Sequence, residues 1–190
     1  MEFTKEKLEK LIKEKGYKFY QNELNIIGVR NSATGNVVTN KFDDWMTVTR
    51  RVGEDKWEVK VWPITTDPGK KPLLEGGNPK GIARLIPGQY IHSWAFGLHR
   101  GKYEALKQCA PVKVTRDGDK DLVYDGVKTD EGVFGINIHK AGANSEDVND
   151  WSHGCMVFKR EADFDEFMKI CKENGASKFT YTLVESKDLA

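Results

Sequence analysis

The sequence of 190 residues predicts a single, mainly β domain (residues 1–190) decorated by two helices. Segments in which apolar and polar residues alternate with period two recur along the chain, and Gly- and Pro-rich turns separate them. Only two segments show the apolar spacing of a helix. No internal repeat divides the chain, and its length suits one domain with a core of its own.

The first predicted element is a helix over residues 1–16. Thr4 is a suitable N-cap, and Gly16 ends the helix. Its remaining surface is almost entirely Lys and Glu, as expected for a face in water. The predicted buried face carries Leu8, Leu11 and Ile12.

The strands predicted from alternation fall in two groups, on either side of a segment rich in Gly and Pro. That segment, residues 63–88, holds five of the six prolines and is expected to form loops with short edge strands. The first group comprises residues 25–30, 45–51 and 56–62, the last two forming a hairpin. The second group comprises residues 89–96, 111–115, 133–139, 155–158 and 178–184, with a helix over residues 160–174.

Charge and composition exclude several classes of protein. Lys and Arg number 30 and Asp and Glu 29, so the net charge of +1 gives no general attraction to nucleic acid. The apolar runs are too short for membrane insertion. Residues 1–15 lack the apolar core of a signal peptide, which predicts synthesis in the cytoplasm without a visible export signal. Three cysteines are too few for a disulfide framework.

The chemistry-bearing stretch is residues 133–158, in which two apolar runs flank a polar loop. His139 stands at the end of the first run, and Ser152-His153-Gly154-Cys155 opens the second. A Cys beside a His can perform covalent acyl transfer, because the thiol attacks a carbonyl while the imidazole takes its proton. The backbone N–H groups of Gly154 and Cys155 are expected to face the developing oxyanion.

His139, a loop of twelve residues and Ser152-His153-Gly154-Cys155 together resemble the L,D-transpeptidase catalytic domain, the YkuD-like family. The resemblance covers about residues 82–158. It implies an L,D-transpeptidase-like β-sandwich with an N-terminal helix and one helix after the catalytic strand. It also implies peptidoglycan stem peptides as substrates and a reaction without a cofactor or metal.

The resemblance further assigns roles to individual residues. Cys155 is implied as the nucleophile and His139 as the base, oriented by a backbone carbonyl near Lys140 or Gly142. His153 is implied to shape the site together with Gly154.

One position departs from the family pattern, because Val157 stands where an Arg usually follows the nucleophile. We therefore expect Arg84, Arg100 or Lys140 to take over the part that this family Arg plays in binding substrate. Ser152 is also a candidate for substrate binding. Trp151 either forms a wall of the groove or pins the loop to the core.

Several functions remain open at this level. Transpeptidation and hydrolysis use the same thioester, and a chain without an export signal fits a wall enzyme of a phage or an injected effector, acting in the wall or periplasm. A cysteine peptidase on ordinary proteins uses the same Cys–His pair. A non-catalytic wall-binding or particle-structural module is the alternative outside enzymology.

The remaining candidates have simpler interpretations. Cys171 is expected in the core and Cys109 in a structural position, while His92 and His99 are expected at the surface or satisfied by neighbours. For His99, lining a substrate groove together with Arg100 and Gly101 is the alternative. Residues 116–125 resemble the start of a calcium loop. Leu122 stands where that loop needs Gly, and Lys128 where it needs Glu, so a polar turn is predicted instead of a metal site.

Overall fold

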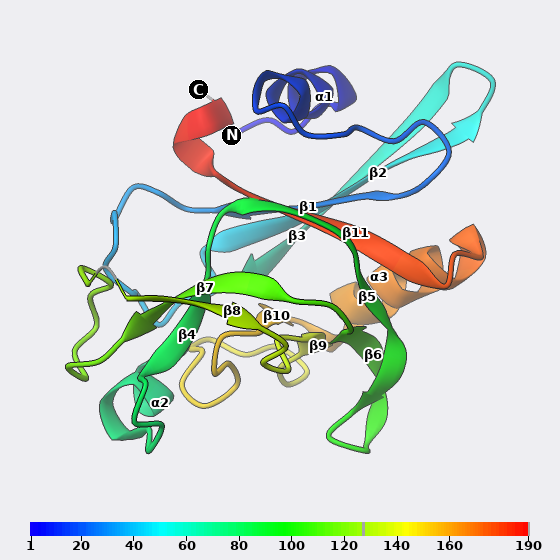
Figure 1. Ribbon diagram of the computed structural model, residues 1–190. Helices are drawn as coiled ribbons and strands as arrows, with labels where there is room; N and C mark the ends of the chain where they lie inside the picture. Colours follow the sequence, from blue (N-terminus) through cyan, green and yellow to red (C-terminus); the bar gives the residue numbers. More distant parts are fainter. Residues whose placement is uncertain (127, 190) are drawn as a thin grey trace.

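The computed structural model describes residues 1–126 and 128–189 and confirms the mainly β class (Figure 1). Its helices are α1 (Lys5–Glu14), α2 (Lys70–Glu75) and α3 (Glu161–Asn174), followed by a 3₁₀ turn at Ser186–Leu189. The strands are β1 (Asn25–Arg30), β2 (Asp44–Gly53), β3 (Lys56–Thr65), β4 (Ile82–Leu85), β5 (Gly88–His99), β6 (Tyr103–Gln108), β7 (Val112–Asp117), β8 (Thr129–Gly132), β9 (Ile138–Lys140), β10 (Met156–Phe158) and β11 (Lys178–Glu185).

Eight strands form a closed barrel in the order β1-β11-β5-β6-β9-β10-β3-β2, so the predicted β-sandwich is wrong. Two parallel pairings are responsible. β1 pairs with β11, which joins the two ends of the chain, and β9 pairs with β10 across the loop that separates them. A sandwich keeps two separate sheets with free edges, whereas these pairings leave the ring without an edge.

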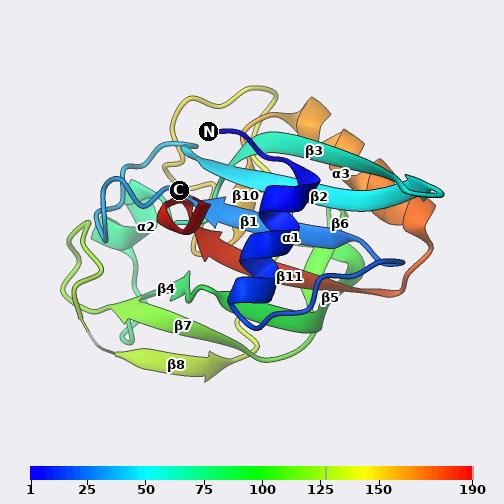
Figure 2. The same ribbon diagram turned by 90° about the horizontal axis from the view of Figure 1, so that it is seen from above.

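The core fills the barrel and also extends beneath α1. Along β1, Ile26 points inward, where Trp94 and Tyr181 meet edge-on with ring centroids 5.4 Å apart. Ile27 points outward and packs against Leu8 of α1. Because both faces of β1 are covered, all six of its residues are buried. Figure 2 shows α1 lying across the strands near β1 and β11.

The two predicted helices are confirmed with shifted ends. Thr4 caps α1 by accepting a hydrogen bond from the Lys7 N–H (3.3 Å). Gly175 ends α3 in a left-handed conformation with φ 77°. Residues 63–88 were expected to form only loops and edge strands. This prediction is wrong at α2, where a short helix forms although it contains Pro72.

The predicted strand over residues 133–139 is also too long, because only β9 pairs there. The side chain of Gln108 explains the difference. Its Oε1 accepts hydrogen bonds from the backbone N–H groups of Phe134 (3.1 Å) and Ile136 (3.0 Å). A glutamine side chain therefore takes the place of a neighbouring strand, and the segment before His139 is irregular.

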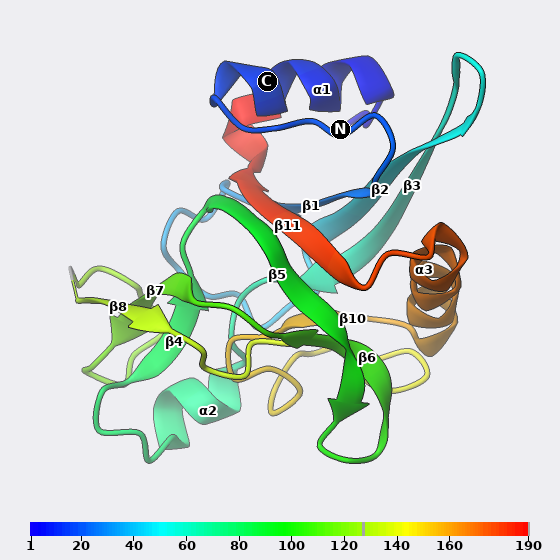
Figure 3. The same cartoon turned by 45° about the vertical axis from the view of Figure 1, so that its right-hand side comes forward.

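A second sheet of order β4-β7-β8 stands beside the barrel (Figure 3). Strands β6 and β8 were not predicted from sequence, and neither was the pairing of this sheet. The segment that follows β8 leads directly to β9, so this sheet borders the strands that carry the candidate residues. In the part of the chain that the structure describes, no helix combines the length and apolarity needed to cross a membrane.

Candidate active site

The candidate base on β9 and the candidate nucleophile directly before β10 lie on the outer face of the barrel. The parallel register of β9 and β10 places Val157 opposite His139 and Met156 opposite Ile138. Ile138 and Met156 belong to the core inside the barrel. Successive side chains of a strand point to opposite faces, so His139 and Val157 point outward. Cys155 packs with Val157 against the same outer cluster.

A pocket of about 490 Å³ opens where the barrel meets the second sheet. Both His139 and Cys155 line it, which brings together two residues 16 positions apart in sequence. Its cationic and imidazole side chains come from Arg100, Arg116, His99, His139 and His153. No Asp or Glu of the described residues lines it. Arg116 pairs with Asp130 (3.3 Å), so Arg100 is the cation of this lining that is left without an ion pair among the described residues.

The hydrogen bond of His139 determines which ring nitrogen is free. His139 Nδ1 lies 2.9 Å from the carbonyl oxygen of Lys140, an acceptor only, so Nδ1 carries the proton. Nε2 therefore has a free lone pair. Burial, together with the neighbouring His99, lowers the pKa of His139 to about 3. At neutral pH the imidazole is an uncharged acceptor for a proton.

The thiol of Cys155 is half-buried and held at two points. It accepts a hydrogen bond from the Asn137 N–H (3.3 Å) and donates to the carbonyl oxygen of Gly135 (3.5 Å). Withdrawal from water raises its pKa to about 11. Thiol and imidazole are thus both neutral at rest, and the thiolate has to form as the proton moves to His139.

The turn before Cys155 depends on Gly154. This residue has φ 120°, and a Cβ on it would lie 2.5 Å from the carbonyl oxygen of Ala83 on β4. Its N–H donates to Ser152 Oγ (3.1 Å), so it is not free for the oxyanion that we expected it to face. The Cys155 N–H has no acceptor among the described residues, which leaves it available as that donor.

Ser152, His153 and Trp151 take different places in this turn. Ser152 is fully buried, and its hydroxyl donates to the carbonyl oxygen of Cys155 (2.8 Å), so it braces the turn and does not line the pocket. His153 lines the pocket and contacts Asp150 through Nε2 (2.8 Å). Trp151 also lines the pocket and is 46% exposed. Of its two expected roles, a wall of the groove is therefore favoured over an anchor that holds the loop against the core.

Of the three candidates to replace the family Arg, only Arg100 lines the pocket. Arg84 is buried in an ion pair with Asp67 (2.6 Å) and does not line the pocket. The Lys140 side chain turns to Glu161 of α3 (2.8 Å), and only its backbone carbonyl serves the site. Val157 itself is fully buried in an apolar cluster with Phe42, Ala141 and Val148.

Sequence reasoning missed Asn137 and Arg116. It preferred a surface or satisfied position for His99 over the pocket lining in which the structure places it. The ring of His99 stacks on that of His139 with centroids 3.9 Å apart and an angle of 17°. This contact was not predicted, because β6 was not predicted and the hairpin that carries His99 to the pocket was therefore not visible. The alternation of residues 136–139 could have placed Asn137 beside His139, since the two are separated by one residue.

The residues with simpler interpretations are placed as follows. Cys171 lies in the core on α3, and Cys109 is exposed. His92 is half-exposed beside Glu23 (3.0 Å), as expected for a satisfied surface histidine.

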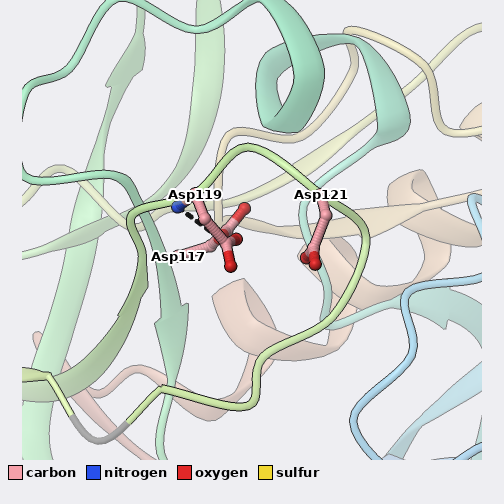
Figure 4. Close-up of side chains that lie close together, drawn as sticks. All are labelled: Asp117, Asp119 and Asp121. Carbon is pink, nitrogen blue, oxygen red and sulfur yellow. Dashed lines mark hydrogen bonds between the residues drawn. The ribbon is translucent and has the colours of Figure 1, made fainter.

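The acidic loop after β7 brings three carboxylates together (Figure 4). Ligand atoms of Asp117, Asp119 and Asp121 all lie within 4.8 Å of one another. The Asp119 N–H donates to Asp117 Oδ1 (3.3 Å), as in a polar turn. Burial and the acidic neighbours raise the pKa of Asp117 to about 6. The absence of a metal stays a prediction.

Comparison of the chain with protein-family profiles, with curated proteins and with solved structures finds no match.

Proposed function

We propose that this protein is a cysteine acyl-transfer enzyme that acts on peptidoglycan stem peptides in the wall or periplasm, either as an L,D-transpeptidase or as a wall hydrolase. The observation that carries the proposal is the hydrogen bond from His139 Nδ1 to the Lys140 carbonyl. This bond leaves Nε2 as the acceptor in the same pocket as the Cys155 thiol. The resemblance to the L,D-transpeptidase catalytic domain supports the choice of substrate.

The reaction proceeds in two halves. In the first, the Cys155 thiol gives its proton to His139 Nε2 as sulfur attacks the carbonyl carbon of the donor peptide. The Cys155 N–H stabilises the oxyanion. The intermediate expels an amine, which takes the proton from His139, and a thioester remains. In the second half an acceptor amine forms a new amide, or water forms an acid, and the thiol is regenerated.

The charge of the pocket supports a donor peptide with a free carboxylate. Arg100 lies in the turn between β5 and β6 with φ 50°, followed by Gly101 with φ 68°. This is the geometry of a tight hairpin turn, which holds the backbone of Arg100 rigidly at the pocket. No ion pair engages its guanidinium among the described residues, so it is free to bind an anion.

The test of the proposed function is mass spectrometry of muropeptides and sacculi incubated with the protein, with Cys155→Ala and with Cys109→Ala. We expect the wild type and Cys109→Ala to form new cross-links, exchange terminal amino acids or release smaller fragments, and Cys155→Ala to do none of these. New bonds identify a transpeptidase and fragments a hydrolase. Unchanged wall material with every variant contradicts the proposal, and cleavage of ordinary proteins alone identifies a peptidase.

Replacing Arg100 by Ala is expected to raise KM for a carboxylate-ended donor peptide about tenfold, because one charge-assisted hydrogen bond to the substrate is lost. The value of kcat is expected to change little. The matched control is the same peptide with an amidated C-terminus, for which Arg100→Ala and wild type are expected to have similar KM values. An equal rise in KM for both peptides contradicts a carboxylate contact.

A further inference from the structure

His99 has no part in the acyl transfer described above, yet its position is unusually well defined. It is the last residue of β5, is only 8% exposed and stacks face to face on His139. Centroids 3.9 Å apart are in van der Waals contact. The ring of His99 thus fixes the plane in which the ring of His139 can lie.

The neighbouring amide determines the protonation of His99. The backbone N–H of Gln108 donates to Asn137 Oδ1 (3.2 Å), which identifies the oxygen of that amide. Asn137 Nδ2 is therefore the atom that faces His99 Nδ1 (3.2 Å), and it is a donor. His99 Nδ1 must accept, so the single proton of His99 is on Nε2. Protonating Nδ1 would set two donors against each other.

A neutral His99 matters because the two stacked rings can hold only one added proton between them. Positive charge on both, at this distance, is strongly unfavourable. Burial and the nearby Arg100 also lower the pKa of His99. The other charged or titratable groups around the stack are Lys102 in the β5–β6 turn, Tyr103 and Lys107 on β6, Lys140 and its partner Glu161, Cys155, His153 and Arg116.

We propose that His99, kept neutral by the amide of Asn137, is a positioning residue that holds the ring of His139 in place. Because His99 stays neutral, His139 can accept the proton of the Cys155 thiol. The inference rests on the proposed function in assigning His139 as the base. Asn137 serves both sides of the pair, since its backbone N–H also contacts the thiol sulfur.

The test measures the rate of Cys155 alkylation by iodoacetamide against pH, in a Cys109→Ser background because Cys109 is exposed. His99→Ala is expected to lower the rate at neutral pH about tenfold, a part of the roughly 10²–10⁴-fold that a general base contributes. His99→Phe keeps a flat ring against His139 and is expected to recover most of that loss. His92→Asn, on the same strand but away from the pocket, is the control.

Asn137→Asp gives the sharpest outcome, because it keeps the acceptor for Gln108 but turns the donor facing His99 into a carboxylate. We expect the pKa of His99 to rise and alkylation to fall at pH 6, with the rate approaching that of wild type at pH 9. The protein has four histidines, so ¹⁵N chemical shifts, assigned by single substitutions, report the tautomers and pKa values of His99 and His139 directly.

An unchanged His139 tautomer and pKa in both His99→Ala and Asn137→Asp would overturn the inference, even if the alkylation rate falls. Such a fall would reflect a merely structural role. Neither measurement needs a wall substrate. A protein that shows the expected shifts but leaves sacculi unchanged therefore contradicts the proposed function and supports this inference.

Discussion

Replacement of His139 by Gln is expected to slow thioester formation on a muropeptide donor by about 10²–10⁴-fold at pH 7. Glutamine fills similar space but cannot accept a proton. The loss is large because burial raises the pKa of the Cys155 thiol to about 11, so almost no thiolate exists at neutral pH without the base. Intact-protein mass spectrometry after rapid mixing measures the thioester directly.

The pH dependence distinguishes this explanation from simple damage to the site. In wild type, attack by a neutral thiol assisted by a neutral imidazole gives a rate that changes little across neutral pH, because the pKa of His139 is near 3 and that of Cys155 near 11. In His139→Gln only the thiolate reacts, so the rate is expected to rise about tenfold per pH unit through the neutral range. A variant with a flat profile contradicts the role of His139 as base.

The lowered pKa of His139 also affects folding stability. Between the ordinary value of 6.5 and about 3, the unfolded chain binds a proton at this residue that the folded chain does not. The free energy of unfolding therefore falls as pH is lowered through that window. His139→Gln removes this contribution, so its loss of thermal stability between pH 7 and pH 4 is expected to be smaller than that of wild type.

Much of the fold could be predicted from sequence wherever local patterning decided the structure. Helix α1, which Thr4 caps and Gly16 follows, and helix α3, which Gly175 follows, carry clear start or stop signals. The closed barrel could not be predicted, because it depends on parallel pairings between segments as distant as β1 and β11. Period-two alternation reveals that a strand has an inner and an outer face, and it does not reveal its neighbour.

The candidate site, too, could be predicted only where its residues lie close together in the sequence. Cys155 and His139 share one continuous stretch of sequence, so local reasoning could pair them. His99 reaches them through the β5–β6 hairpin and Arg116 through the second sheet, and neither contact has a local signal. Arg84, a candidate by charge alone, is instead held by Asp67, which sequence does not place beside it.

Substituting Ala for Gly154 is expected to destabilise the protein by roughly 2–4 kcal/mol and to abolish acyl transfer. Two effects add. The backbone at φ 120° disfavours any side chain, and the new Cβ would lie 2.5 Å from the Ala83 carbonyl oxygen of β4, a backbone atom that cannot turn aside. Relief requires the turn to move, and Cys155 is the next residue. Thermal unfolding is expected to show a fall in Tm of about 5–15 °C.

Gly135→Ala is the matched control, because it separates conformational strain from the steric clash. Gly135 also has positive φ, at 72°, and lines the same pocket, but a Cβ there meets nothing within 4 Å. Its substitution is expected to cost only about 1 kcal/mol. The comparison is made on folding stability alone, because the Gly135 carbonyl oxygen contacts the Cys155 thiol. If Gly154→Ala is no more destabilising than Gly135→Ala, the steric contact with β4 does not constrain the turn before Cys155. If Gly154→Ala is less stable by the expected margin, the second sheet sets the position of the nucleophile.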